Sequence, residues 1–210
     1  MQEYVGLLRG ININGKNRVN MSDLKTAMEE AGYRNVITYL NSGNLLFDVD
    51  LKHADVHLQQ LIREVFGLDV PVYIIPLHEL KEIVKQAPEW WNSGNKDLYD
   101  NLIFVLTEES GSDIFAQIGQ PTEGLERIHC FENAIFHTFD RKMYGKCRWW
   151  KKTAQKGIAE KLTIRSGNTI QKLLEKAEKK NNREMNLPVI CLESHWHKHV
   201  FICIVVIHIV

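Results

Sequence analysis

The chain has 210 residues, of which 44% are hydrophobic and 25% are charged. This length suits one large domain or two small ones, and the apolar content is enough for a packed core, which excludes general disorder. Lysine plus arginine and aspartate plus glutamate number 26 each, so the formal net charge is zero. A zero net charge argues against a dedicated nucleic-acid coat, though not against a local basic patch.

Residues 1–76 contain six short segments in the order strand, helix, strand, strand, helix, strand. Asn20 can cap the first helix and Gly32 can end it, while Gly67 can end the second. The segment "NSGN" joins two apolar runs as a hairpin. The four predicted strands are "EYVGLLRGI", "NVITYL", "LLFDV" and "VPVYIIP". This order is typical of a ferredoxin-like (βαββαβ) half.

The same order recurs in residues 99–180, after a linking helix and loop in residues 77–98. The predicted strands are "NLIFVL", "LERIHCF", "AIFHTF" and "LTIR". One helix of this half should carry the apolar stripe Trp150, Ala154, Ile158 and Leu162, and a last helix should end at Lys180. We therefore predict an α+β protein with two ferredoxin-like halves, a linking helix and an atypical C-terminal tail.

The tail, residues 181–210, has no helical stripe and ends in a β-branched run. We expect it to be disordered or to add a strand to a sheet edge, and to be dispensable. His195, His197 and His199 would share one face of a strand, which suits zinc or copper. Glu193 and Cys191 continue the alternation, but no fourth ligand is evident, so we predict no metal site and no cofactor.

Targeting signals are not visible in the sequence. The N-terminus lacks a basic region followed by an apolar stretch, and no apolar run reaches the roughly 18–20 residues that cross a bilayer. The four cysteines form no C-x-x-C pair. We expect a cytoplasmic protein with free thiols and no membrane partner, and the sequence leaves its oligomeric state open.

Gly10, Gly15 and Lys16 stand at the spacing of a nucleotide-binding P-loop. A working P-loop needs serine or threonine after the lysine to bind magnesium, and this chain has Asn17 there. Its helix should also begin at the lysine, whereas the capping signal lies at Asn20. The spacing therefore does not indicate an NTPase.

The loop of residues 9–18 is nevertheless rich in asparagine and cations, which suits an anion. It would equally suit a well-bonded connection whose cations are solvated. Two further motifs, the "NSGN" hairpin and "RSGN" before the last helix, could contribute to the same site. The candidate ligand-binding residues are Arg9, Asn12, Lys16, Asn17, Arg18, Ser42, Asn44, Arg165 and Asn168. We expect Arg165 and Asn168 to close the site from the second half.

Three stretches together resemble a known family: "YVGLLRGININGKNRVNMSDLK", "YLNSGNLLF" and "TIRSGNTIQKL". They are similar to the uncharacterised bacterial family catalogued as domain of unknown function 1697. Asn14 stands where many members have glycine, and Ser166 replaces an asparagine of the late motif. The resemblance covers about residues 1–178 and implies two ferredoxin-like domains. It implies no activity, cofactor or catalytic residue, but it favours the polar loop as a ligand site.

These observations favour a protein that binds a phosphate-bearing small molecule or nucleotide at loop 9–18. One alternative is a single-stranded nucleic-acid-binding module, because ferredoxin-like sheets can present aromatic side chains to bases. The basic and aromatic stretch of residues 141–152 suits that alternative, although its tryptophans also suit a core. The others are an enzyme of unknown reaction, for which no catalytic residue can be assigned, and a purely structural or interaction protein.

Overall fold

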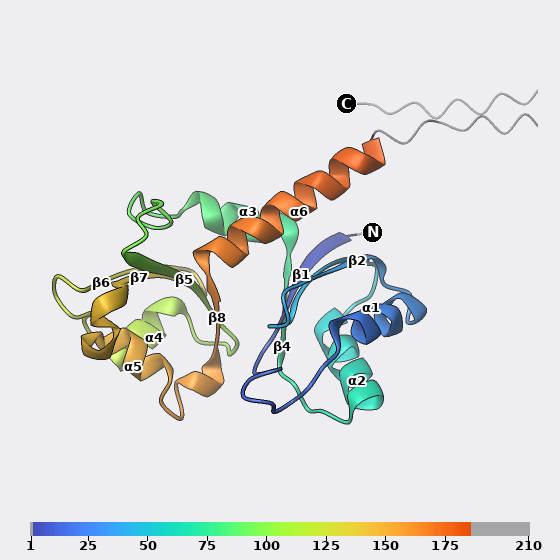
Figure 1. The fold of residues 1–210 in the computed structure, drawn as a ribbon, viewed down its shortest axis with the longest axis horizontal. Coiled ribbons are helices and arrows are strands. Elements are labelled where there is room, and N and C mark those ends of the chain that lie inside the picture. Colours follow the sequence, from blue (N-terminus) through green and yellow to red (C-terminus); the bar gives the residue numbers. More distant parts are fainter. Residues whose placement is uncertain (1, 186–210) are drawn as a thin grey trace, which may run out of the picture.

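The computed structural model describes residues 2–185, which form two halves of the same architecture (Figure 1). The strands of the first half form an antiparallel sheet in the order β2-β3-β1-β4. Its elements are β1 (Gln2–Leu8), α1 (Met21–Glu30), β2 (Arg34–Tyr39), β3 (Asn44–Val49), α2 (Ala54–Phe66) and β4 (Val72–Pro76). The βαββαβ order predicted for this half is confirmed.

The second half repeats this plan after the linking helix α3 (Leu77–Lys85), with strand order β6-β7-β5-β8. Its elements are β5 (Leu98–Val105), α4 (Gly111–Ile118), β6 (Glu126–Phe131), β7 (Ala134–Asp140), α5 (Arg148–Thr153), β8 (Leu162–Ser166) and α6 (Gly167–Met185). Two short 3-10 helices, η1 (Arg141–Lys146) and η2 (Ala159–Lys161), flank α5. The predicted α+β fold class is confirmed.

Two predicted helix boundaries differ from the structure. The helix expected to run from Trp150 to Leu162 ends at Thr153, because the chain turns through Gly157, whose φ angle is +88°. The last helix continues beyond Lys180 to Met185, so residues 181–185 belong to α6 and not to the tail. Residues 186–210, which include His195, His197 and His199, lie outside the described residues.

Successive side chains of the central strands point to opposite faces of the sheet, and both faces are buried, which explains why the apolar runs of these strands are nearly continuous. On β1, Val5 and Leu7 belong to a middle core shared by the two halves, whereas Leu8 belongs to a core beneath α1 and α2. On β5, Phe104 faces the middle core and Ile103 faces the core beneath α4 and α5. Both faces of each sheet are therefore covered, as the period of two predicts for strands with apolar residues on both sides.

The middle core is completed by α3 and α6, which cross the junction of the two halves (Figure 1). Leu80 of α3 and Leu173 of α6 are fully buried in it. Near the C-terminal end of α6, Lys180 forms ion pairs with Glu3 at 3.0 Å and with Asp48. Helix α6 thus starts at β8 in the second half and ends against β1 and β3 of the first.

Candidate functional site

The loop between β1 and α1 follows an unusual backbone path. Gly10, Asn12, Asn14, Gly15 and Asn17 all have φ angles between 47° and 76°, in the left-handed region. Glycine adopts this region without strain, and asparagine does so more readily than other residues with a side chain. The composition of the loop is therefore explained in large part by its shape.

Two asparagine side chains hold this shape by bonding to the backbone. Asn12 Nδ2 donates to the carbonyls of Val19 and Asn41 at 2.9 and 2.8 Å, while Asn12 Oδ1 accepts from the Val19 N–H at 2.9 Å. Asn17 Nδ2 donates to the Gly10 carbonyl at 3.0 Å. Of these two predicted ligand-binding residues, Asn12 uses both amide N–H groups and its oxygen on backbone groups, whereas Asn17 uses one N–H.

The loop does not have the geometry of a P-loop. Helix α1 begins at Met21, not at Lys16, and the Asn20 side chain caps it by accepting from the Ser22 N–H at 2.9 Å. The helix N-terminus therefore lies beyond the loop instead of following the lysine directly. The predicted start of this helix at Asn20 and Met21 is confirmed.

Arg165 reaches from β8 into the first half and is only 8% exposed. Its Nε donates to Asn44 Oδ1 at 2.5 Å, and its Nη2 donates to the Leu8 carbonyl at 2.7 Å. Its other acceptors are the carbonyls of Ser42, Gly43 and Ile164 and the hydroxyl of Thr163. The guanidinium thus joins the second half to the Ser-Gly-Asn hairpin of the first.

All of these acceptors are uncharged. Burial lowers the pKa of Arg165 to about 10, so the group still carries its charge at neutral pH. In residues 2–185, no carboxylate forms an ion pair with it. A positive charge without a counter-charge therefore lies directly behind the hairpin and raises the local electrostatic potential.

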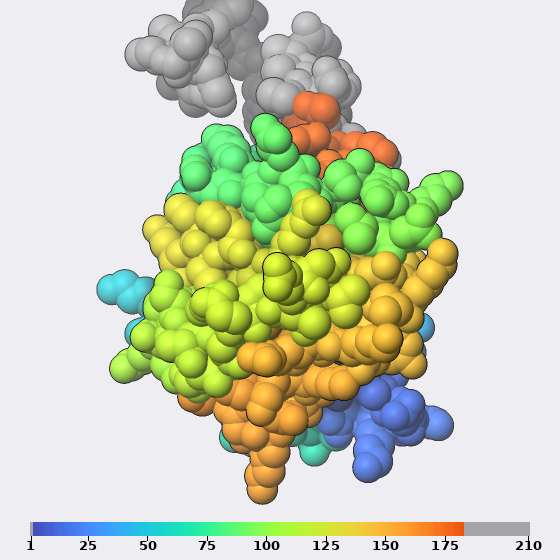
Figure 2. Space-filling model, turned by 90° about the vertical axis from the view of Figure 1, so that its left-hand side faces the viewer, coloured from blue at the N-terminus to red at the C-terminus, as the bar shows by residue number. Residues whose placement is uncertain are grey.

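Lys16 and Arg18 are the predicted site residues that stay free for a ligand. Both side chains are exposed, and within the described part of the chain neither has a hydrogen bond or an ion pair. Arg9 is held by the Glu160 carbonyl, to which its Nη1 donates at 2.7 Å. The N-terminal segment in blue stands out beside the orange chain of the second half at the lower edge of Figure 2.

A hollow of about 480 Å³ lies beside the loop, at the start of α1. Its lining residues are Asn12, Gly15, Arg18, Val19, Asn20, Met21 and Asn41. Ser42 is exposed at the neighbouring hairpin and accepts a hydrogen bond from Asn44 Nδ2 at 3.0 Å. Anions are stabilised by cations and by helix N-termini, and this hollow has both.

Asn44 and Asn168 do not contribute to the hollow. Asn44 is fully buried, with its amide bonded to Ser42 and to the Tyr39 carbonyl. Asn168 lines a separate hollow of about 280 Å³ in the second half, together with Asn92 and Arg141. The structure therefore brings Arg165 to the first-half motifs but leaves Asn168 apart, because the chain turns away into α6 after β8.

Gly43 sets the close approach of the hairpin to β1. Its φ angle is +76°, and an added Cβ would lie 2.6 Å from Leu8 Cβ and 2.9 Å from Ile11 Cδ1. We expect Gly43→Ala to lower the free energy of unfolding by about 3 kcal/mol, from left-handed strain together with overpacking. Urea denaturation at pH 7 measures this loss.

Gly94→Ala is the matched control, because Gly94 has a φ angle of +82° and no atom within 4 Å of the added Cβ. It carries the same backbone strain without the clash, so its loss should be about 1 kcal/mol. Equal losses for the two variants would show that contact with Leu8 and Ile11 is unimportant.

The second half contains a buried acid–base pair that the sequence patterns do not indicate. Glu126 Oε1 lies 3.3 Å from His137 Nε2, and the side chains are 0% and 1% exposed. Glu126 also accepts from the N–H groups of Thr122, Trp149 and Trp150 at 3.0 to 3.2 Å. The carboxylate therefore caps the start of α5. In the sequence, this buried pair is indicated only by a histidine inside the apolar run "AIFHTF".

Within the basic and aromatic stretch of residues 141–152, Cys147 and Trp149 are buried, whereas its cations and Tyr144 are exposed. Trp149 is fully buried, and its indole N–H donates to the Gly119 carbonyl at 2.9 Å. Burial raises the pKa of the Cys147 thiol to about 11, so this cysteine is not activated as a nucleophile. Among residues 2–185 no cluster of histidine, cysteine or carboxylate side chains could hold a metal ion.

Comparison with known families matches residues 1–136 to the family model described as "Protein of unknown function (DUF1697)". The chain belongs to this family. The DUF1697 chain is also similar in structure to the conserved bacterial protein SP0830 from Streptococcus pneumoniae. The TM-score is 0.69 at 24% sequence identity, and the match covers 83% of this chain and 97% of the other. This likeness supports the fold alone.

A further comparison adds no argument about this DUF1697 chain. An unknown protein from Galdieria sulphuraria matches with a TM-score of 0.22 and 12% identity, over 79% of this chain and 96% of the other. No curated protein matches the chain. None of the helices in residues 2–185 is both long and apolar enough to cross a lipid bilayer.

Proposed function

We propose that this DUF1697 protein binds a phosphate-bearing small molecule, such as a nucleotide, at the polar loop. The observation that carries the proposal is the pair of exposed cations Lys16 and Arg18 on the polar loop. Neither forms an ion pair within the described residues, and the same holds for the half-buried Arg9 and the buried Arg165. Exposed cations with no counter-charge of their own favour an anionic ligand.

The shape of the loop supports the proposal. Arg18 lines the hollow at the start of α1, where its guanidinium can bind a phosphate through two parallel hydrogen bonds. The backbone bonds of Asn12 and Asn17 fix the loop before any ligand arrives. A loop that is already ordered loses less conformational entropy on binding.

The structure gives less support to the nucleic-acid alternative. Modules that bind single strands on a sheet present aromatic side chains on an open face. Here one face of each sheet lies in the middle core, and the other is covered by α1 and α2 or by α4 and α5. The enzyme alternative gains no support from the Glu126–His137 pair, because both side chains are buried and a substrate cannot reach them.

A cytoplasmic location stays a prediction.

The double variant Lys16→Ala/Arg18→Ala tests the proposal with pyrophosphate and adenosine triphosphate as probes. We expect the wild-type melting temperature to rise with either probe, by the equivalent of about 2.7 kcal/mol at 100 times the dissociation constant. The double variant should keep its fold and lose this stabilisation, because both exposed cations are gone. Thermal unfolding at constant ionic strength measures the effect.

Arg127→Ala/Lys156→Ala is the charge-matched control, since both of these side chains are exposed and lie outside the loop. This control should respond to the probes as the wild type does. An equal melting shift in the wild type and in Lys16→Ala/Arg18→Ala would disprove the site, as would the absence of any shift in the wild type.

A further inference from the structure

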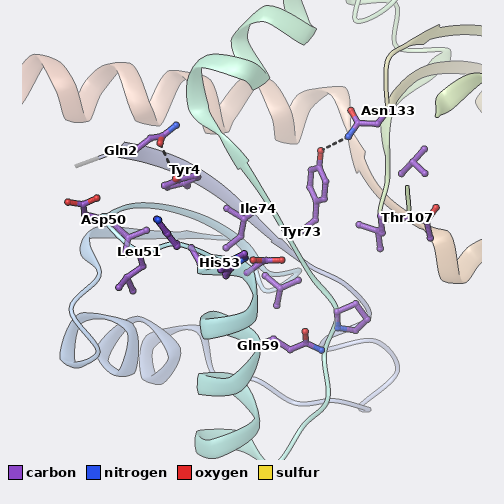
Figure 3. A pocket seen from close by; sticks show the side chains of 18 residues that line it. Gln2, Tyr4, Asp50, Leu51, His53, Gln59, Tyr73, Ile74, Thr107 and Asn133 are labelled. Atoms are coloured by element: carbon purple, nitrogen blue, oxygen red, sulfur yellow. Dashed lines mark hydrogen bonds between the residues drawn. The ribbon is translucent and has the colours of Figure 1, made fainter. Parts of the chain in front are cut away.

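A cleft of about 970 Å³ lies between the two halves, apart from the polar loop (Figure 3). The first half lines it with β4, the start of α2 and the first residues of β1, and the second half lines it with residues 105–107 and Asn133. Tyr73 points across it toward Asn133, whose Nδ2 donates to the phenol oxygen at 3.4 Å. Clefts at such domain junctions are common places for ligands.

The wall formed by β4 is an open sheet edge. Strand β4 is the last strand of its sheet and pairs only with β1. The register places Leu7 opposite Tyr73 and Val5 opposite Ile75, and the same ladder continues to the bond from the Arg9 N–H to the Pro71 carbonyl at 2.9 Å.

In an antiparallel pair, every second residue directs its backbone groups at the partner strand. Pro71 belongs to the set that faces β1, and so do Tyr73 and Ile75. Val72 and Ile74 therefore direct their N–H and C=O groups away from β1, and both residues line the cleft. Within residues 2–185 no hydrogen bond satisfies these outward groups.

We propose that this cleft binds a short extended peptide, which pairs with β4 as an added strand. The N–H and C=O groups of an extended peptide can pair with the outward C=O and N–H groups of Val72 and Ile74, because both sets recur at the two-residue period of a strand. Pro71 precedes the open edge and Pro76 ends it without an N–H, so the edge accepts only a few residues. This short edge favours a peptide segment over the sheet of a second copy of the chain.

The side chains around the edge indicate which peptide fits. Burial raises the pKa of Tyr73 to about 12, so its phenol stays neutral. Thr107, Asn133 and Gln59 add hydroxyl and amide groups. Beside the start of α2 the lining carries two carboxylates, Asp50 and Asp55, and one ammonium, Lys52. The lining therefore suits uncharged side chains along β4 and does not favour a strongly acidic peptide.

A library of random heptapeptides with blocked ends is the probe, and Ile74→Pro is the deciding variant. Proline removes the outward N–H of Ile74 without removing a bond of the β1–β4 ladder. Peptides that bind the wild type should bind Ile74→Pro about tenfold or more weakly, as expected for the loss of a backbone hydrogen bond. Ile74→Ala is the control, because it shortens the same side chain and keeps the N–H, and it should retain the affinity.

Two outcomes would overturn the proposal. Either no peptide of the library binds the wild type, or the peptides that bind it have the same affinity for Ile74→Pro. If Ile74→Pro does not fold, hydrogen exchange in the wild type decides instead. A bound peptide must slow exchange at the amides of Val72 and Ile74, and unchanged exchange there would refute strand addition. Lys16→Ala/Arg18→Ala should bind the peptides normally, which keeps this inference separate from the proposed anion site.

Discussion

Replacing Arg165 by methionine should lower the free energy of unfolding by about 3–5 kcal/mol, because several buried acceptors lose their donor at once. The change leaves Asn44 Oδ1 and the Leu8 carbonyl without the bonds at 2.5 and 2.7 Å. Methionine keeps much of the apolar volume of the side chain, so lost packing contributes little. Urea denaturation measures the difference.

Arg165→Lys separates the charge from the geometry. Lysine keeps the cation but cannot donate in the planar fork that reaches Asn44 and Leu8 together, so its loss should be intermediate. Arg127→Ala removes an exposed arginine of β6 and should change stability by less than about 0.5 kcal/mol. If Arg165→Met lost less than about 1 kcal/mol, the buried network would not hold the two halves together.

Glu126→Gln should lower the free energy of unfolding by about 3 kcal/mol at pH 7. Burial alone would raise the pKa of Glu126, but hydrogen bonds from His137 and from three backbone N–H groups outweigh it and lower the pKa to about 2. A depression of that size relative to an ordinary glutamate corresponds to about 3 kcal/mol. Glutamine also turns an NH₂ group toward donors that need an acceptor.

The contribution of Glu126 to the free energy of unfolding should fall as the solution becomes acidic. A carboxylate whose pKa is lower in the folded state stabilises the fold above its unfolded pKa. That stabilisation is lost as the pH falls from about 4.5 through about 2. The stability difference between the wild type and Glu126→Gln should therefore be constant near neutral pH and shrink across that window. Urea denaturation at several pH values from neutral to acid measures it.

Glu123→Gln is the control for this experiment, because Glu123 is an exposed glutamate only three residues away. It should leave both the stability and its pH dependence almost unchanged. A gap between the wild type and Glu126→Gln that stays constant down to pH 2 would show that the carboxylate charge is not what stabilises the start of α5.

Much of the fold follows from local patterns. Leu24 and Met28 share one face of a helix that starts at a capping asparagine, and both are fully buried in the structure. The end of α5 could not be predicted in this way, because apolar residues at helical spacing continue through Ile158 while the backbone turns. Periodicity reports which side chains are buried but not which backbone conformation buries them.

The candidate site was harder to predict, for a physical reason. An asparagine in a loop can form hydrogen bonds with a ligand or with the backbone of its own loop, and the sequence does not distinguish the two roles. Asn12 bonds to the backbone. Arg165 and Asn44 are 121 residues apart, and only the packing of the two halves brings them together. The unpaired groups of β4 are likewise invisible in the sequence, because they depend on strand order and register.

The middle core has a consequence for the synthesis of the protein. Val5 and Ala177 lie in the same core, so this core cannot close until nearly all of the described chain has left the ribosome. At about 5–20 residues per second, the roughly 100 residues after the first half take several seconds to synthesise. During that time Leu7, Leu46 and Ile75, which are buried in the finished protein, have no partner from α6. One face of the first sheet therefore stays uncovered while the second half is made.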